Sequence, residues 1–193
     1  MKNTRVVLSC LLALALAVSG CSKESADTAA AAGAKRTASV EVVAAEARGF
    51  TVGAMMAANP VYVFFDPQCP HCARLWQAST PLHRKLKFVW IPVGIINAAS
   101  TSQGAALLSA GDPAQRMEEH EKSILAGQGG TSASSPPAEL EQAVKNNTRL
   151  FNNFGIESVP VVIARNARTG MTVTHNGSMD TAALAELLGV DAP

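Results

Sequence analysis

The hydrophobic pattern of the chain predicts alternating strands and helices. The runs 60–65 and 87–96 are rich in β-branched and aromatic residues without polar alternation, which is typical of strands buried on both faces. A third buried strand is expected at 159–164 and a short one at 171–175. Helices are expected at 70–80, 101–110, 113–125, 138–154 and 180–188, and a loop rich in Gly, Ser and Pro at 127–137. This order predicts an α/β domain with a central β-sheet flanked by helices and a helical insertion.

The first twenty residues have the layout of a secretory signal peptide. Lys2 and Arg5 precede an apolar run over 6–18, which is short for a permanent transmembrane helix. The run ends in Val-Ser-Gly before Cys21, which resembles the bacterial lipobox, where the cysteine is acylated and becomes the first residue of the mature chain. The alternatives are an ordinary cleaved signal with an incidental cysteine, or a transmembrane anchor. We expect a lipoprotein signal peptide over 1–20 and lipidation of Cys21.

The segment 21–39 is expected to be a flexible tether. It consists mainly of Ala, Ser, Thr, Lys and Glu, and such a stretch buries too little apolar surface to offset its ordering entropy. Ser22 follows Cys21 where the bacterial sorting pattern uses Asp for inner-membrane retention, so we expect the periplasmic face of the outer membrane.

The remaining chain, 40–193, suits one domain. With 48% hydrophobic residues the chain has enough apolar side chains for a core. The net charge is +1 and no basic patch rich in aromatics is present, so nucleic-acid binding has no support.

The cysteines carry the candidate chemistry. Of four, Cys10 lies in the signal peptide and Cys21 is assigned to lipid, which leaves Cys69 and Cys72. In an exported protein, a C-x-x-C pair indicates a redox-active site or a metal site. Pro70 suits the first turn of a helix, so Cys69 is expected at the helix N-terminus, exposed to solvent and facing unsatisfied amides. Cys69 is therefore the predicted nucleophile and Cys72 the shielded resolving thiol.

His71 is expected to tune this pair. An imidazole beside the sulfur would stabilise the Cys69 thiolate and lower the pKa of the thiol below about 8.5. Stabilising the thiolate stabilises the reduced form, which predicts an oxidising disulfide.

Two other interpretations of the pair remain open. A structural disulfide would close a very short loop and constrain little chain entropy. A metal site would need further ligands, and His83, His120 and His175 lie in unrelated segments and are expected at the surface. We expect no metal and no cofactor. Trp76 and Trp90 are expected in the core, and Asp66 is expected to form the turn before the cysteines.

Four segments carry a family resemblance. The run F-F-D-P-Q-C-P-H-C-A-R-L-W at 64–76 is similar to the active-site segment of DsbC/DsbG-type thiol-disulfide interchange proteins, and the likeness is closest to DsbG. The runs I-P-V-G-I-I at 91–96, G-D-P-A-Q at 111–115 and N-N-F-G-I-E-S-V-P at 152–160 fit the same family. The resemblance implies a periplasmic thioredoxin-like domain that acts on protein disulfides. It also implies a cis Pro160 packed against the cysteines, with the backbone of Val159 left free to hold a substrate strand.

The chain departs from that family in several places. Only about twenty residues, 40–59, separate the tether from the first predicted strand, so we expect a monomer without the family's N-terminal dimerisation domain. Pro70-His71 and Val159 match the oxidase DsbA, where DsbG-like proteins have Pro-Tyr and Thr. Thioredoxins place a buried Asp six residues before the first cysteine, and Val63 occupies that position here, so thioredoxin-type proton handling is expected to be absent.

These features predict a thiol-disulfide oxidoreductase, either a disulfide exchange and isomerase enzyme or an oxidase. The expected partners are cysteine-containing periplasmic clients, a membrane redox partner for recycling, and the membrane itself through the lipid. The alternatives are a chaperone-like binding lipoprotein with incidental cysteines, or a lipoprotein that handles copper or zinc.

Overall fold

The computed structural model describes residues 35–133 and 135–193. The expected signal peptide, Cys21 and the tether up to residue 34 lie outside the described residues. The strands are β1 (Phe50–Gly53), β2 (Pro60–Phe65), β3 (Lys87–Pro92), β4 (Val161–Arg165) and β5 (Thr172–Asn176). The helices are α1 (Val40–Glu46), α2 (Pro70–Ser79), α3 (Ala98–Leu108), α4 (Pro113–Leu125), α5 (Ala138–Asn153) and α6 (Thr181–Leu188), with a 3-10 turn η1 (Thr80–Leu82) after α2.

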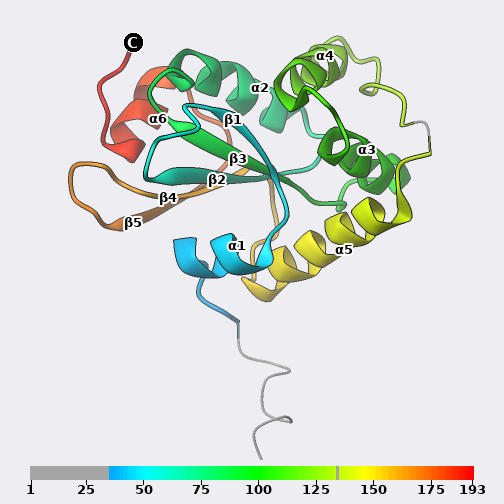
Figure 1. The fold of residues 1–193 in the computed structure, drawn as a ribbon, viewed down its shortest axis with the longest axis horizontal. Helices are drawn as coiled ribbons and strands as arrows, with labels where there is room; N and C mark the ends of the chain where they lie inside the picture. Colours follow the sequence, from blue (N-terminus) through cyan, green and yellow to red (C-terminus); the bar gives the residue numbers. More distant parts are fainter. Residues whose placement is uncertain (1–34, 134) are drawn as a thin grey trace, which may run out of the picture. The chain divides into compact units, whose positions relative to one another are not determined.

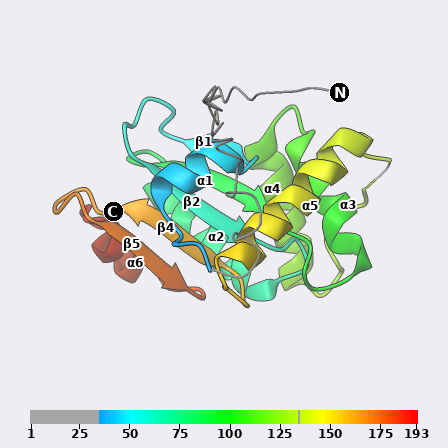
Figure 2. The ribbon, with the colours of Figure 1, turned by 90° about the horizontal axis from the view of Figure 1, so that it is seen from below.

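The five strands form one mixed sheet between two layers of helices. The strand order is β1-β3-β2-β4-β5, in which β2 and β3 are parallel and the other neighbours are antiparallel. Helices α1 and α5 lie on one face, and α2 and α6 lie on the other (Figures 1 and 2). This architecture confirms the predicted α/β class with a central sheet flanked by helices.

Strand β2 is buried on both faces, as its apolar run predicted. Val61, Val63 and Phe65 point into the core that contains α2 and α6, whereas Tyr62 and Phe64 point into the core with α1 and α5. This alternation is the period of two that any strand imposes on its side chains. Both faces of β2 are therefore apolar, because helices cover both faces of the sheet.

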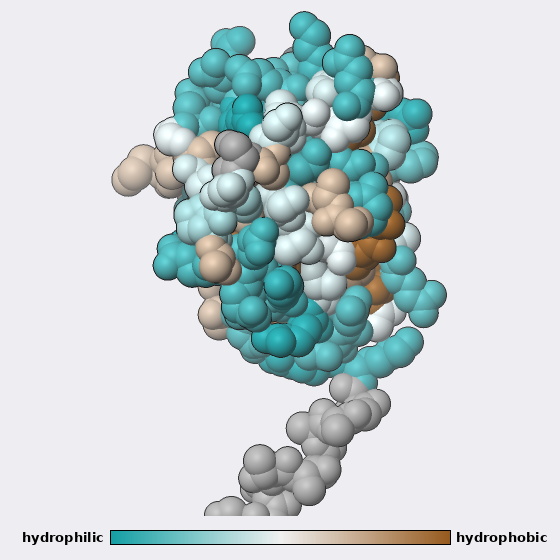
Figure 3. All heavy atoms as spheres, turned by 90° about the vertical axis from the view of Figure 1, so that its right-hand side faces the viewer, coloured by the Kyte–Doolittle hydropathy of each residue, from teal (hydrophilic) through white to brown (hydrophobic). Residues whose placement is uncertain are grey.

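The helical insertion between β3 and α5 consists of α3 and α4. Helix α3 begins at a capping box in which the Asn97 side chain accepts a hydrogen bond from the amide of Ala99 and Ser100 accepts from the amide of Asn97. Helix α4 packs against α2, and α3 packs against α5. On the side of the molecule where α3 and α5 lie, polar and near-neutral side chains predominate and apolar ones form narrow strips (Figure 3). Within the insertion, α4 thus covers α2 with its buried face.

Two elements in 40–59 have no counterpart among the predicted ones. Helix α1 begins at the Ser39 cap and buries Val43, and β1 pairs antiparallel with β3, placing Phe50 beside Trp90. Phe50 also packs edge-to-face on Phe65 at a ring distance of 6.1 Å. Elements of seven and four residues carry too little periodicity to be recognised locally, and tertiary packing stabilises them here.

Strand β3 ends at Pro92, four residues before the predicted end. The apolar residues Ile95 and Ile96 leave the sheet and are partly exposed, because their amides turn towards the Asp66 carboxylate. None of the helices among the described residues is long and apolar enough to cross a membrane.

Candidate functional site at the start of helix α2

The two cysteines lie where β2 passes into α2, and Cys69 is the N-cap of the helix. Its Sγ accepts a hydrogen bond from the amide of Cys72 at 3.3 Å, and Pro70 occupies the first helical position. The place of the pair is as expected. The expected exposure of Cys69 is wrong, because its exposed fraction is 4%, while that of Cys72 is 0%.

The loop before β4 explains the burial of Cys69. The Val159–Pro160 peptide bond is cis, and the carbonyl oxygen of Val159 lies 3.7 Å from the Cys69 Sγ, as a hydrogen-bond acceptor for the thiol. Pro160 itself is buried. The segments around Cys69 and Val159, ninety residues apart in sequence, therefore meet at the sulfur, as the resemblance implies.

The environment separates the pKa values of the two thiols. The pKa of Cys69 is lowered to about 7, first because the Cys72 thiol donates a hydrogen bond to it, and then because the amides of Cys72 and His71 do so. Burial and the charge of Asp66 oppose this. Burial raises the pKa of Cys72 well above its ordinary value, and the neighbouring Cys69 thiolate raises it further. One thiol is therefore half ionised at neutral pH and the other is fully protonated.

His71 does not act on the sulfur as predicted. Its side chain is exposed, and its Nδ1 accepts a hydrogen bond from the Arg74 guanidinium at 3.2 Å. In the first turn of a helix the amide faces the N-cap while the side chain points outward, so His71 stabilises the Cys69 thiolate through its backbone N–H. The imidazole therefore gives no support to a strongly oxidising pair.

Asp66 does more than form a turn. Its buried carboxylate accepts hydrogen bonds from the amide of Gln68 at 2.8 Å and from those of Ile95 and Ile96 at 2.7 and 3.0 Å. The first bond shapes the turn before Cys69, and the other two tie that turn to the segment after β3. Asp66 thereby fixes the position of the cysteine loop against the sheet.

His120 was expected at the surface and is fully buried. Its Nε2 donates to the carbonyl of Pro67 at 2.7 Å and its Nδ1 accepts from the amide of Thr131 at 3.1 Å. Burial lowers its pKa, so the ring is neutral and links the cysteine turn to the loop after α4. The signal was available in the sequence, because Met117, His120, Glu121 and Ile124 follow the helical spacing of a buried stripe.

The other two histidines are half-buried. His83 packs against the rings of Trp76 and Phe88, each at 5.3 Å, and His175 lies in β5. In the described ranges no group of three or more His, Cys, Asp or Glu side chains has the arrangement of a metal site.

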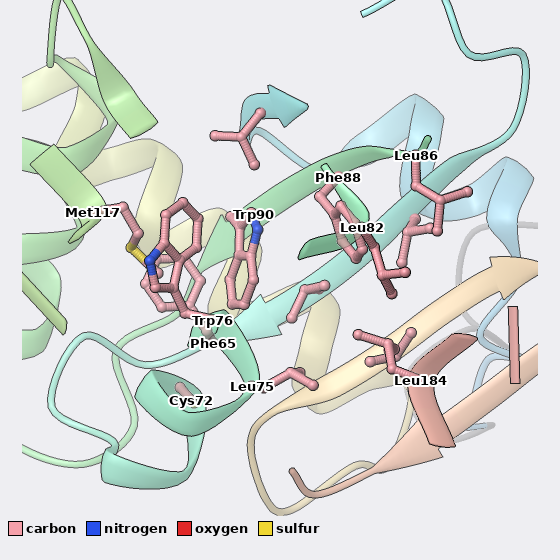
Figure 4. Packing of buried hydrophobic residues seen from close by; sticks show 14 of the residues in the cluster. Phe65, Cys72, Leu75, Trp76, Leu82, Leu86, Phe88, Trp90, Met117 and Leu184 are labelled. Carbon is pink, nitrogen blue, oxygen red and sulfur yellow. The ribbon is translucent and has the colours of Figure 1, made fainter. Parts of the chain in front are cut away.

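Helix α2 rests on an aromatic core. Trp76 and Trp90 are buried, as predicted, with their rings at 5.3 Å in an edge-to-face arrangement. Figure 4 shows Met117 of α4 beside Trp76, with Cys72 on the same helix as Trp76. This packing holds the helix that carries the cysteines against both the sheet and the insertion.

The separated pKa values predict selective alkylation. The rate at which iodoacetamide modifies Cys69 in the reduced protein should rise with pH around a midpoint of about 7, since only the thiolate reacts. Cys72 should stay unmodified in the folded protein over the same range and react once urea unfolds the chain. Mass spectrometry of quenched samples measures both rates. Equal reactivity of the two thiols in the folded protein would contradict this geometry.

Comparison with known proteins places the domain in a family. No protein-family model matches the chain. The thiol:disulfide interchange protein DsbG of Pseudomonas aeruginosa is 33% identical over 135 residues, which are 67% of this chain and 50% of that protein. DsbG of Escherichia coli K12 is 31% identical over 108 residues, which are 53% of this chain and 42% of that protein. The matched part is a DsbC/DsbG-type domain. The chain spans about half the length of these two relatives.

Solved structures share the fold of this DsbG-type domain. The catalytic domain of Proteus mirabilis ScsC superimposes with a TM-score of 0.58 at 18% identity, covering 77% of this chain and 95% of that one. A periplasmic thioredoxin-like protein from Salmonella enterica serovar Typhimurium gives 0.60 at 15% identity, with 79% and 97% covered. The thiol-disulfide exchange protein α-DsbA2 of Wolbachia pipientis gives 0.57 at 17% identity, with 72% and 85% covered. These similarities confirm the thioredoxin-like fold.

Proposed function

We propose that the protein is a periplasmic thiol-disulfide oxidoreductase that exchanges disulfides with cysteine-containing client proteins through Cys69 and Cys72. The observation that carries this proposal is the pair of unequal thiols at the start of α2. Cys69 has a pKa of about 7 and contacts the cis-proline loop, while Cys72 is buried and protonated. A structural disulfide would not need this inequality.

The geometry suggests an order of steps. The Cys69 thiolate attacks a client disulfide, which forms a mixed disulfide and releases one client thiolate. The Cys72 sulfur then attacks Cys69, which forms the Cys69–Cys72 disulfide and releases the second client thiolate. The client is thereby reduced by two electrons and the pair is oxidised by two. Run backwards, the same steps donate a disulfide to a reduced client.

The cis-proline loop provides the place for the client. Val159 presents its carbonyl 3.7 Å from the Cys69 sulfur, and Pro160 packs beneath it. An extended client segment that pairs with the backbone of Val159 would bring its own cysteine next to Cys69, because strands add to each other through main-chain hydrogen bonds. Val159 and Pro160 are thus assigned to substrate binding, and Pro70 and His71 to shaping the amides around the sulfur.

The expected redox potential is intermediate. DsbA has a nucleophile with a pKa of about 3.5 and a potential of about −120 mV. A Cys69 with a pKa of about 7 lacks most of that thiolate stabilisation, and at about 30 mV per pKa unit the potential falls by roughly 100 mV, to about −220 mV. Such a value suits disulfide exchange and isomerisation more than one-way oxidation.

The N-terminal sequence and the relatives support a proposal for the localisation. We propose that Cys21 is lipidated, that the following residues up to about 34 tether a monomeric domain to the outer membrane, and that a membrane redox partner recycles the pair. The tether is shorter than the expected 21–39, because the amide of Arg36 donates to the carbonyl of Asn153 and Ser39 caps α1. The Salmonella protein with the same fold is described as periplasmic, which supports the compartment. Lipidation predicts an acylated N-terminal Cys21 in the mass of the mature chain, and release into the soluble periplasmic fraction after Cys21→Ser.

The experiment that tests the activity is the reactivation of a protein with scrambled disulfides, such as ribonuclease, in a glutathione buffer. The purified protein should accelerate the recovery of ribonuclease activity over the buffer alone, and prior alkylation of Cys69 should remove the effect. If recovery is unchanged while the protein prevents aggregation of the client, a chaperone-like binding function replaces the proposal. If the reduced protein instead binds copper or zinc stoichiometrically, a metal-handling function replaces the proposal.

A further inference from the structure

The proposed exchange requires a proton acceptor for Cys72, and none of the residues assigned so far has this role. Cys72 is buried and protonated, so it must lose its proton when it attacks the mixed disulfide, and no solvent reaches it directly. The sheet beneath offers no free base, because Val63, at the position where thioredoxins have an acid, is buried in the apolar core. The buried Asp66 carboxylate, directly after β2, already accepts three backbone hydrogen bonds. A proton acceptor must therefore come from another element.

Helix α4 supplies one buried acid at this place. Glu121 is 1% exposed, and neither of its carboxylate oxygens has a hydrogen-bond partner among the described residues. Burying an unpaired carboxyl costs several kcal/mol unless the group is neutral or is served by water. Because substitution by an apolar side chain would remove that cost, the acid calls for a functional explanation.

Contacts on both sides of Glu121 place it against the cysteine segment. His120, the preceding residue, donates to the carbonyl of Pro67, two residues before Cys69. Glu118, one turn earlier, accepts a hydrogen bond from the indole of Trp76 at 2.6 Å. Met117, on the same helix face, lies in the core cluster that contains both cysteines. Glu121 thus belongs to the stripe of α4 that covers α2.

We propose that Glu121 carries the proton of the resolving thiol. When Cys72 attacks, the Cys72–Cys69 bond forms, the bond from Cys69 to the client sulfur breaks, the client sulfur leaves as a thiolate, and the Cys72 proton passes to the Glu121 carboxylate, directly or through one buried water. In the reverse reaction the Glu121 carboxyl returns the proton to the Cys72 thiolate as the pair is reduced. No further reactant is needed, and the total charge is the same on both sides.

The charges around Glu121 determine at which stage of the reaction its carboxyl group is ionised. Burial raises its pKa well above the ordinary value, and the negative charges of Cys69, Asp66 and Glu118 raise it further. Once Cys69 is part of a mixed disulfide its negative charge no longer raises the pKa of Glu121, so the carboxylate forms more readily at the stage at which an acceptor is required. Of the elements that pack against α4, β1 and α3 contain no ionisable side chain, and the His71 and Arg74 side chains of α2 are exposed at the surface.

The test separates the two steps of oxidation by glutathione disulfide. Samples of the reduced full-length protein are quenched with acid at short times, and mass spectrometry follows first the glutathione adduct on Cys69 and then its loss as the Cys69–Cys72 disulfide forms. In Glu121→Gln the first step should stay within about twofold of the wild type. The second step at pH 7 should slow by about 100-fold, the lower end of the range for general base catalysis, so the adduct accumulates.

The pH profile of the second step distinguishes proton transfer from a structural effect. In the wild type its rate should level off above the pH at which Glu121 ionises, whereas in Glu121→Gln it should rise about tenfold per pH unit, because hydroxide remains the only acceptor. Glu121→Asp should restore part of the plateau. If the Gln side chain of Glu121→Gln is not accommodated in the core, Glu121→Met replaces it, and the same loss of the plateau is expected. Glu119→Gln, the same change at an exposed acid of α4, is the matched control and should behave as the wild type.

The outcomes distinguish this inference from the function on which it rests. A second step in Glu121→Gln within twofold of the wild type, or an equal slowing of both steps, overturns the role of Glu121. A wild-type protein that forms no glutathione adduct at all overturns the proposed exchange itself.

Discussion

Cys72→Ser is expected to trap the protein in a stable mixed disulfide with its client. Cys69 keeps its position at the helix N-cap and its contact with the Val159 carbonyl, so the first attack proceeds, but no thiol remains to release the client. Cys69→Ser should abolish exchange, because a serine hydroxyl does not ionise near neutral pH. Non-reducing gels of periplasmic extracts measure the complexes, and turnover with a model disulfide should fall at least a thousandfold in Cys69→Ser.

Thiol removal outside the pair provides the control for this result. Cys21→Ser, which alters only the proposed lipid attachment site, should leave the exchange rate of the purified protein unchanged. Trapped complexes with Cys69→Ser in place of Cys72→Ser would reverse the roles assigned to the two sulfurs. Equal trapping by both variants would contradict a division into attacking and resolving thiols.

Asp66→Ala should destabilise the fold more than the loss of an exposed acid, because the Asp66 carboxylate is buried. It leaves three backbone N–H groups, on Gln68, Ile95 and Ile96, without the carboxylate that accepts their hydrogen bonds. An unsatisfied buried donor costs about 1–3 kcal/mol, and water will partly replace the lost oxygens, so the free energy of unfolding should fall by about 3 kcal/mol. Urea unfolding, with the slope of the transition compared between variants, measures it.

The matched control is Asp112→Ala. Asp112 caps α4 at the surface and accepts one hydrogen bond, from the amide of Gln115, so its loss should cost about 1 kcal/mol. Equal effects of the two substitutions would mean that the buried carboxylate does not hold the cysteine turn against the segment after β3. The alkylation midpoint of Cys69 should also move in Asp66→Ala, and towards lower pH, because a charge that raises the pKa of the thiol is removed.

The strands and helices with strong periodicity were predictable. Strand β2 has the predicted bounds 60–65, and α4 has the predicted bounds 113–125, because an apolar run and a proline at the first helical position are local signals. Helix α1 and strand β1 were not predictable, because these short segments depend on packing partners that are distant in sequence. The end of β3 at Pro92 likewise depends on Asp66, which lies 29 residues before Ile95.

The site shows the same division between local and distant causes. The place of Cys69 and Cys72 at a strand-to-helix junction follows from their spacing and from Pro70. The burial of Cys69 depends on the loop at Val159, ninety residues away, so it could not be read from the motif alone. The outward direction of the His71 side chain follows from its place in the first turn of α2, a local cause that the sequence interpretation did not take into account. Among the buried polar residues around the two cysteines, those of α4 could be recognised in the sequence from their helical spacing, whereas the burial of Asp66 could not.

Equilibration of the purified protein with glutathione buffers shows whether Cys69 and Cys72 form a reversible redox couple. The fraction of free Cys69 and Cys72 thiols, counted by alkylation and mass spectrometry at each ratio of reduced to oxidised glutathione, gives the potential of the pair. We expect a reversible two-electron couple at about −220 mV, from the pKa of about 7 at Cys69. The absence of any reversible couple between these two cysteines would contradict it.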